Sequence, residues 1–284
     1  MWRRVRLLLM GAAVGVLCFG APVHADEPKN KGLFISPLRS YIHVAANSAQ
    51  HGTFTVANNT ASPMSIDLSV EQFSVADYTY DYQFERAKED WVKISQTQLE
   101  LAPDKSQNLN YTVATPPKAT PGGHYFTIFA TAHLQGNPSQ IRAATVLYVT
   151  VEGALVKTSI VNHTSVPSFS FGRDIDFSLD VKNTGNTHFF TYTSGTLSGF
   201  SANSDAPEST NLLLPGKSRI IGSTIRAPLL PGIYKATYGY RIDDGQRVQR
   251  SSYIVYIPPW SLLVPIGIAW FVYALHHYRK RRRT

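Results

Sequence analysis

Short runs of alternating apolar and polar residues dominate the middle of the chain. In residues 175–181 every odd position is apolar and every even position is polar, and residues 64–70 and 234–242 alternate in a similar way. Half-buried antiparallel strands show this period because successive side chains point to opposite faces of a sheet. Clusters of Pro, Gly, Asn and Ser separate the runs, so the pattern predicts an all-β region from 26 to 258.

The strand and turn signals occur twice along this region. Residues 54–60 and 177–185 each indicate a strand that enters an Asn-containing turn. The later matches are Leu101–Ser106 with Leu213–Ser218, and Pro121–Tyr125 with Pro231–Tyr234. The matched prolines lie about 110 residues apart, which is the size of one immunoglobulin-like domain and too long for a solenoid repeat. We therefore expect two tandem Ig-like β-sandwich domains.

Turn signals set the expected domain boundaries. An apolar strand over 144–151 ends before Glu152-Gly153-Ala154, and we expect the next strand to begin at Leu155. The first domain is therefore expected over 26–153 and the second over 154–258, with its last strand at 252–257.

The N-terminus has the pattern of a secretory signal peptide. Three arginines precede the apolar run 7–20, and Val23-His24-Ala25 resembles a cleavage site, so we expect a signal peptide over 1–25. An uncleaved N-terminal anchor is the alternative. The only cysteine is Cys18, inside the apolar run. Cleavage after Ala25 would leave a chain without cysteine, which suits an exported protein of the bacterial envelope.

The C-terminus has the pattern of a membrane anchor. Residues 260–278 read WSLLVPIGIAWFVYALHHY, and five cations follow directly at 279–283. A helix of this length spans roughly 28 Å, close to one bilayer core. We expect a transmembrane helix over 259–278 that contacts the lipid bilayer through 260–278. The positive-inside rule puts the basic tail, 279–284, in the cytoplasm and the ectodomain outside. A buried core helix is the alternative.

The charge distribution argues against a nucleic-acid partner. The net charge is +8, and the three arginines of the leader and the five cations of the tail account for all of it. The predicted ectodomain is therefore neutral overall, and the basic isoelectric point reflects targeting and topology.

The sequence offers little catalytic chemistry. The histidines lack metal-ligand spacing, and no G-x-S-x-G or phosphate-binding loop occurs. Asp174, Asp176 and Asp180 would share one face of a strand, either as solvated positions or as a cation site. We expect a protein that is not an enzyme and that binds neither a cofactor nor a metal.

An aromatic segment is the main candidate for ligand binding. Tyr78, Tyr80, Tyr82 and Phe84 would fall on one face of an extended segment, within an insertion that runs up to Trp91. Flat rings beside carboxylates can form a platform for sugars or peptides. The alternative is that the rings pack onto the core of their own domain.

The architecture resembles the WxL-interacting proteins of Gram-positive cell surfaces. The matching stretches are Ile35-Ser36-Pro37, Asn58-Asn59-Thr60, Trp91-Val92, Leu101–Ser106 and Pro121–Tyr125. The resemblance covers most of residues 33–278. It implies a first domain that binds peptidoglycan and a second domain that contacts other surface or host molecules.

A second resemblance is to the pilus chaperones of the periplasm, which also pair two Ig-like domains. Their first strand carries an arginine that anchors the carboxylate of a client, and Arg39-Ser40-Tyr41-Ile42 is similar in placement. This resemblance implies that Arg39 binds an exported protein; the alternative is a surface cation near a strand start. Those chaperones are soluble, whereas this chain ends in a predicted membrane helix.

The sequence thus predicts a membrane-anchored binding or scaffold protein of the bacterial cell envelope, with an envelope polymer such as peptidoglycan or a surface or exported protein as its partner. The alternative is a membrane-tethered assembly factor similar to pilus chaperones. In the first case the aromatic segment carries binding, and in the second Arg39 and the adjoining edge strand carry it.

Overall fold

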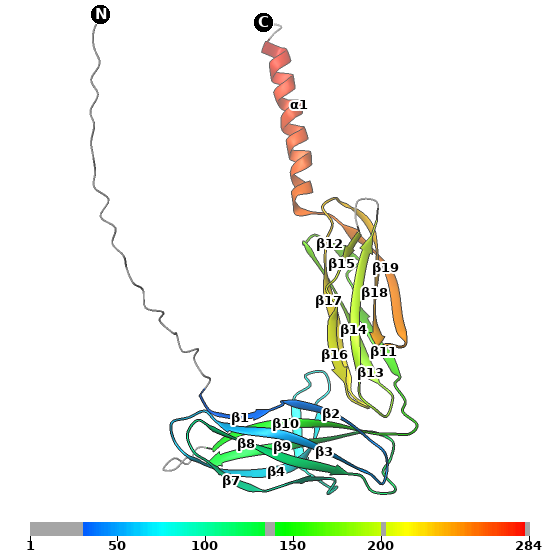
Figure 1. Ribbon diagram of the computed structural model, residues 1–284. Coiled ribbons are helices and arrows are strands. Elements are labelled where there is room, and N and C mark those ends of the chain that lie inside the picture. The colour runs from blue at the N-terminus through cyan, green and yellow to red at the C-terminus, as the bar shows by residue number, and fades with distance from the viewer. Residues whose placement is uncertain (1–30, 134–139, 200–202, 282–284) are drawn as a thin grey trace, which may run out of the picture. The chain divides into compact units, whose positions relative to one another are not determined.

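The computed structural model describes residues 31–133, 140–199 and 203–281. Within these ranges the chain is built of strands, apart from a short 3-10 helix and one α-helix at the C-terminal end (Figure 1). The predicted fold class, two Ig-like β-sandwiches followed by one helix, is confirmed. The predicted signal peptide, residues 1–25, and the last three residues of the basic tail lie outside the described residues.

The first sandwich has two sheets. One sheet contains, in spatial order, β1 (Leu33–Ser36), β3 (Ala49–Asn58), β8 (Lys105–Ala114) and β6 (Val92–Ile94). The other contains β2 (Arg39–Val44), β10 (Gln140–Val151), β9 (Gly122–His133), β4 (Met64–Val75) and β5 (Tyr82–Arg86), with β7 (Gln98–Leu101) also paired to β4. The described strand pairs of this sandwich are antiparallel except β2 with β10, which run parallel.

The second sandwich repeats this plan. Its smaller sheet contains β11 (Ser159–Ser165), β13 (Asp174–Asn183) and β17 (Ser218–Arg226). Its larger sheet contains β12 (Phe169–Ser170), β19 (Arg247–Tyr256), β18 (Gly232–Ile242), β14 (Phe189–Ser198) and β15 (Asn203–Asp205), with β16 (Ser209–Leu213) also paired to β14. Again one edge strand, β12, runs parallel to its neighbour β19.

Each sandwich has its own core. The alternating positions Met64, Ile66 and Leu68 are buried in the first core, together with residues of both sheets such as Val56 and Val113. The odd positions of 175–181 are buried in the second core. Period-two burial of this kind removes one face of each strand from water and drives the two sheets together.

A buried asparagine shows the internal repeat at atomic level. Asn58 Nδ2 donates to the carbonyl groups of Ser62 (2.8 Å) and Leu101 (3.0 Å). Asn183 Nδ2 donates to those of Thr187 (2.9 Å) and Leu213 (3.0 Å). Both asparagines are fully buried, so each satisfies carbonyl groups that would otherwise lack a partner in the core. The asparagine turns found in the sequence are therefore equivalent structural elements.

In the link between the sandwiches, the structure differs from the prediction in where the next strand begins. β10 ends at Val151, but β11 begins at Ser159 rather than at Leu155. The Asn186 side chain accepts a hydrogen bond from the N–H of Val156 (2.8 Å), and the Asn186 N–H donates to the Val156 carbonyl. These bonds hold the link in an irregular path. Boundaries at 26–153 and 154–258 remain our proposal for the domains.

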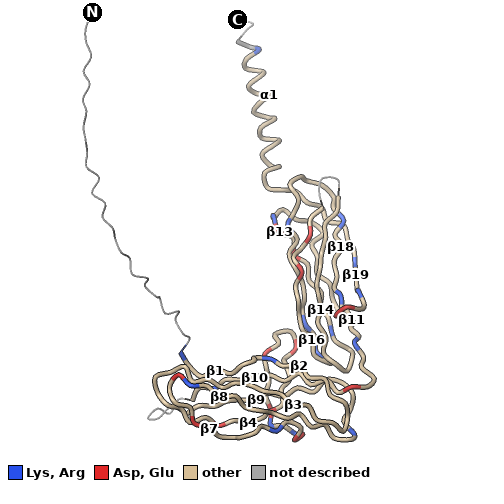
Figure 2. Tube along the Cα trace, viewed as in Figure 1, with Lys and Arg blue, Asp and Glu red and all other residues tan. Residues whose placement is uncertain are grey.

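The C-terminal end is helical and exposed. A 3-10 turn, η1 (Pro259–Leu262), leads into α1 (Leu263–Arg281). The segment Pro259–Arg279 has a mean hydropathy of 1.4 and none of it is buried, so it is long and apolar enough to cross a membrane. Figure 2 shows α1 without Lys, Arg, Asp or Glu until its last turn.

Candidate functional site

Arg39 lies where one edge of the larger sheet of the first sandwich changes from paired to unpaired. It is the first residue of β2 and lies opposite Val146 of β10. The Val146 N–H donates to the Leu38 carbonyl (3.0 Å), and the Glu152 N–H donates to the Val44 carbonyl (2.9 Å). Since backbone groups alternate in direction along a strand, the even-numbered residues of β10 direct their N–H and C=O groups toward β2.

The first half of β10 extends past the end of β2. Residues 140–145 pair with β9 on one side but have no partner on the β2 side among the described residues. By the same alternation, Gln140, Arg142 and Ala144 direct their backbone groups to this open side. We call residues 140–145 the open edge of β10. Such an edge is a template for the addition of another strand.

A cleft of about 350 Å³ lies beside Arg39. Arg219 of the second sandwich lines the same cleft, and Tyr80, Tyr82 and Tyr148 form part of its wall. The Arg39 side chain is exposed and has no ion-pair partner among the described residues. Guanidinium groups bind carboxylates through charge-assisted, often paired, hydrogen bonds. The cleft can therefore hold a carboxylate.

The outer face of β10 supports the cleft wall. Val146 and Tyr148 pack with residues of β4 and with Leu214 of the second sandwich. The Tyr41 ring stacks on that of Tyr148, with centroids 5.0 Å apart and an interplanar angle of 18°. The His188 ring lies 5.3 Å from the Tyr148 ring. This aromatic cluster buries apolar surface where the two sandwiches meet.

The turn that carries Tyr78 and Tyr80 docks onto the second sandwich. Both residues have left-handed φ values, 66° and 60°. The Tyr78 N–H donates to the Ser218 carbonyl (2.9 Å), and the Ser218 N–H donates to Asp77 Oδ1 (2.7 Å). The Leu214 N–H donates to Tyr80 Oη (3.3 Å). These two predicted site residues therefore serve the contact between the sandwiches.

The other predicted aromatic residues lie elsewhere. Tyr82 and Phe84 on β5 stack in parallel with centroids 5.8 Å apart, and Phe84 packs edge-on against Phe129 at 4.8 Å. Trp91 is only 6% exposed and packs in the first core beside His124. Because the segment bends at Tyr78 and Tyr80, the rings do not form the single platform that an extended segment would give.

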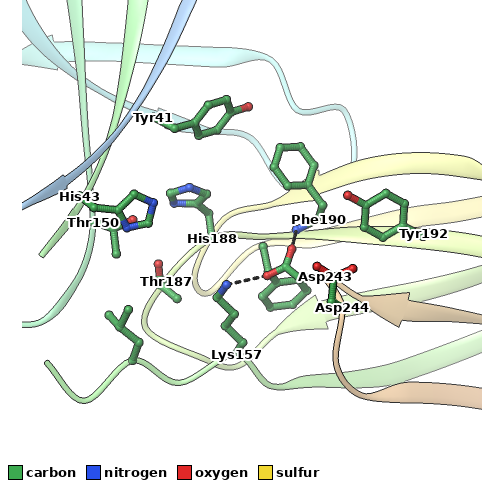
Figure 3. Close-up of a pocket in the computed structure, with 12 residues that line it drawn as sticks. Tyr41, His43, Thr150, Lys157, Thr187, His188, Phe190, Tyr192, Asp243 and Asp244 are labelled. Atoms are coloured by element: carbon green, nitrogen blue, oxygen red, sulfur yellow. Dashed lines mark hydrogen bonds and ion pairs between the residues drawn. The ribbon is translucent and has the colours of Figure 1, made fainter. Parts of the chain in front are cut away.

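A second cleft, also of about 350 Å³, lies between the sandwiches (Figure 3). Its Lys157 Nζ lies 2.6 Å from Asp243 Oδ2, and Asp243 Oδ1 accepts a hydrogen bond from the Phe190 N–H. Lys157 therefore has an ion-pair partner, whereas Arg39 has none among the described residues. His188 and His43 line the same cleft.

Burial controls protonation at this contact. Desolvation, helped by the nearby Lys157 and His43 and opposed by Asp243, lowers the pKa of His188 to about 4. Desolvation also raises the pKa of Tyr148 well above its usual value. His188 and Tyr148 are therefore neutral at pH 7.

Among the described residues, no group of three or more His, Cys, Asp or Glu side chains could hold a metal ion. Within the aspartate set singled out in the sequence, Asp176 Oδ1 accepts a hydrogen bond from Thr224 Oγ1 (2.6 Å), and Asp180 Oδ2 accepts one from Tyr78 Oη (3.3 Å). These contacts fit polar strand positions.

Sequence reasoning missed Arg219, Asp77 and Tyr148. Each follows a recognisable signal: Arg219 comes after a Pro-Gly turn, Asp77 opens the aromatic segment, and Tyr148 interrupts an apolar strand. Nothing in the sequence links them, because their proximity depends on how the two sandwiches pack.

No family model matches the chain, so the resemblance to WxL-interacting proteins finds no support there. No curated protein matches it either. Among solved structures, the chain is similar to the Class 5 fimbriae chaperone CfaA, with 10% identity over 80% of this chain and 100% of that chain, at a TM-score of 0.45.

It is also similar to the CsuC–CsuE chaperone–tip adhesion subunit complex of Csu pili from Acinetobacter baumannii, with 11% identity, 80% and 99% coverage and a TM-score of 0.41. The E. coli chaperone DraB matches with 14% identity, 79% and 97% coverage and a TM-score of 0.37. At these levels the likeness does not say what this chain binds.

Proposed function

We propose that this protein is a non-enzymatic, membrane-anchored binding protein of the cell envelope that holds an extended C-terminal segment of another exported protein. The segment would add to the open edge of β10, and Arg39 would bind its terminal carboxylate. The observation that carries the proposal is that the open edge ends at an exposed arginine, and that this arginine has no ion-pair partner in the part of the chain that the structure describes. This is the assembly-factor alternative predicted from the sequence.

Strand direction supports the role of Arg39. A segment beside residues 140–145 would continue the line of β2, which runs parallel to β10. If it ran parallel as well, its C-terminus would point at the start of β2, where Arg39 lies. Its backbone groups would pair with those of Gln140, Arg142 and Ala144.

The free energies of their hydrogen bonds indicate that the open edge and Arg39 would contribute to binding in different ways. Each backbone hydrogen bond contributes about 0.5–1.5 kcal/mol and is independent of sequence, whereas a hydrogen bond to a charged group contributes about 1.5–3 kcal/mol. The edge would therefore accept many sequences. Arg39, helped by Arg219 across the cleft, would select a free carboxylate.

The similar solved structures are consistent with this proposal but do not carry it. The Acinetobacter baumannii structure is named as a complex of a chaperone with a tip adhesion subunit, and we extend that kind of partner to this chain only as a proposal. The membrane anchor would distinguish this protein from a soluble chaperone. Peptidoglycan binding stays a prediction.

The test is photocrosslinking with the full-length protein in its own membranes. A photoreactive amino acid replaces Gln140 on the open edge or, as a control position, the exposed Lys118. We expect a discrete set of exported proteins to crosslink at position 140 and not at position 118.

Arginine variants complete this test. Arg39→Ala should remove most of the crosslinked product at position 140, whereas Arg86→Ala, at an exposed arginine of β5, should leave it unchanged. Crosslinking that persists in full in the Arg39→Ala protein, or that is equal at both positions, would contradict the proposal.

A further inference from the structure

A row of exposed apolar side chains crosses the second sandwich close to the start of η1. Val255 of β19 lies opposite Phe169 of β12 on one side and Ile233 of β18 on the other. Their exposed fractions are 40%, 41% and 67%. Residues directly opposite one another on neighbouring strands share one face, so the three side chains form a continuous apolar row.

The turn before β18 extends this row toward the helix. Leu229 and Leu230 in that turn are 74% and 45% exposed. Trp260 Nε1, in η1, donates a hydrogen bond to the Leu229 carbonyl (3.2 Å). The turn is therefore fixed to the first residues of the helical segment. We call Phe169, Leu229, Leu230, Ile233 and Val255 the membrane-proximal patch.

Chain length keeps the patch close to the start of the apolar helical segment. Val255 is four residues before Pro259, where the segment that is apolar enough to cross a membrane begins. Four extended residues span at most about 14 Å. The turn with Leu229 and Leu230 lies closer still, because it contacts Trp260 directly.

We propose that the membrane-proximal patch inserts into the interfacial region of the lipid bilayer, so that the second sandwich rests on the membrane. This inference depends on the anchoring part of the proposed function. Leucine and aromatic side chains beside a membrane helix gain hydrophobic free energy when they leave water at the interface. The exposed Arg173 lines one pocket with Leu229 and Trp260, where it can bind an anionic headgroup.

Continuity with the helix favours lipid over other occupants of the patch. A second copy or another protein would have to approach directly beside the helical segment, because the hydrogen bond from Trp260 holds the Leu229 turn against its first residues. Lipid is present there as soon as the helix spans the bilayer, and burial of the patch then requires no further partner.

The test uses the full-length protein in nanodiscs of phosphatidylcholine and phosphatidylglycerol. In a Cys18→Ser background, an environment-sensitive fluorophore is attached at Leu230→Cys or, as a control, at Ile220→Cys, an exposed position of β17 in the other sheet. We expect blue-shifted emission at 230, strongly quenched by lipid that carries a doxyl group near its headgroup. Position 220 should show neither effect.

A second variant guards against a local effect of the label. Leu229→Asp together with Ile233→Asp should abolish the quenching at 230, because buried charges are disfavoured in the bilayer. Quenching at 230 no stronger than at 220 would overturn the proposal. A blue shift without lipid quenching that vanishes on dilution would also overturn it, in favour of a second copy. Crosslinking at Gln140 in the protein's own membranes reports the proposed function separately.

Discussion

Arg39 lies opposite Val146 in the parallel pairing of β2 with β10, and β2 does not extend beyond it toward the beginning of β10. One residue therefore ends a paired stretch of the sheet and starts an open one. A cationic side chain at that position lies where the end of an added strand would come. The proposed binding mode rests on this relationship.

Loss of the guanidinium should weaken binding without unfolding the protein. Arg39 is exposed, so Arg39→Ala should change the free energy of unfolding by less than about 0.5 kcal/mol. Affinity for a bound segment should fall about tenfold or more, because a charge-assisted hydrogen bond is lost. Thermal unfolding and binding measured on the same preparation check both outcomes; loss of binding together with loss of folding would make Arg39 a structural residue instead.

Proline substitutions at two neighbouring alanines distinguish the open edge of β10 from its paired edge. The Ala144 N–H points to the open side of β10 and the Ala143 N–H points to β9, so Ala144→Pro should fold and lose binding. Ala143→Pro breaks a ladder hydrogen bond and should cost about 1–3 kcal/mol of stability. Circular dichroism melts and the crosslinking assay distinguish the two; equal destabilisation by both would mean that the edge is not open.

The docked turn should couple the two sandwiches. Asp77→Ala removes the acceptor for the Ser218 N–H and should cost about 1–3 kcal/mol at the contact between the sandwiches. We expect calorimetry to show one transition for the parent protein and a broadened or divided transition for the variant. Asp81→Ala, at an exposed residue of the same turn, is the matched control and should have no such effect.

His188 should make the contact sensitive to acid. Its folded-state pKa, about 4, is below the ordinary value of 6.5, mainly because of burial and then because of Lys157 and His43. The neutral ring therefore adds stability that is complete above pH 6.5 and is lost as the pH falls to about 4. Urea unfolding between pH 7 and 4 should show this loss, and His188→Asn should flatten it. An identical pH dependence in the variant would rule out His188 as the titrating group.

Local patterns in the sequence were sufficient for the fold. Alternation at residues 64–70 and 175–181 predicted strands that the structure contains, and the matched turns predicted equivalent positions such as Asn58 and Asn183. Each of these signals depends only on side-chain direction and turn chemistry within a few residues.

The site was less predictable because it depends on contacts between distant segments. Arg39 was found as a candidate through a resemblance, but Arg219, which lines the same cleft, was not. The aromatic segment illustrates the difficulty. An extended segment would have given one platform, whereas two left-handed residues bend it and hydrogen bonds to the second sandwich fix that bend. Composition carries no information about such a bend.

The most direct test of the central claim compares two forms of one peptide, the C-terminal segment of an exported protein captured by crosslinking at position 140. The peptide is made with a free carboxylate or with a C-terminal amide, and its Kd is measured for the full-length protein and for its Arg39→Ala variant. We expect amidation to weaken binding to the parent protein about tenfold or more and to have no effect on the variant. Equal affinity of both peptides for the parent protein would contradict carboxylate anchoring by Arg39.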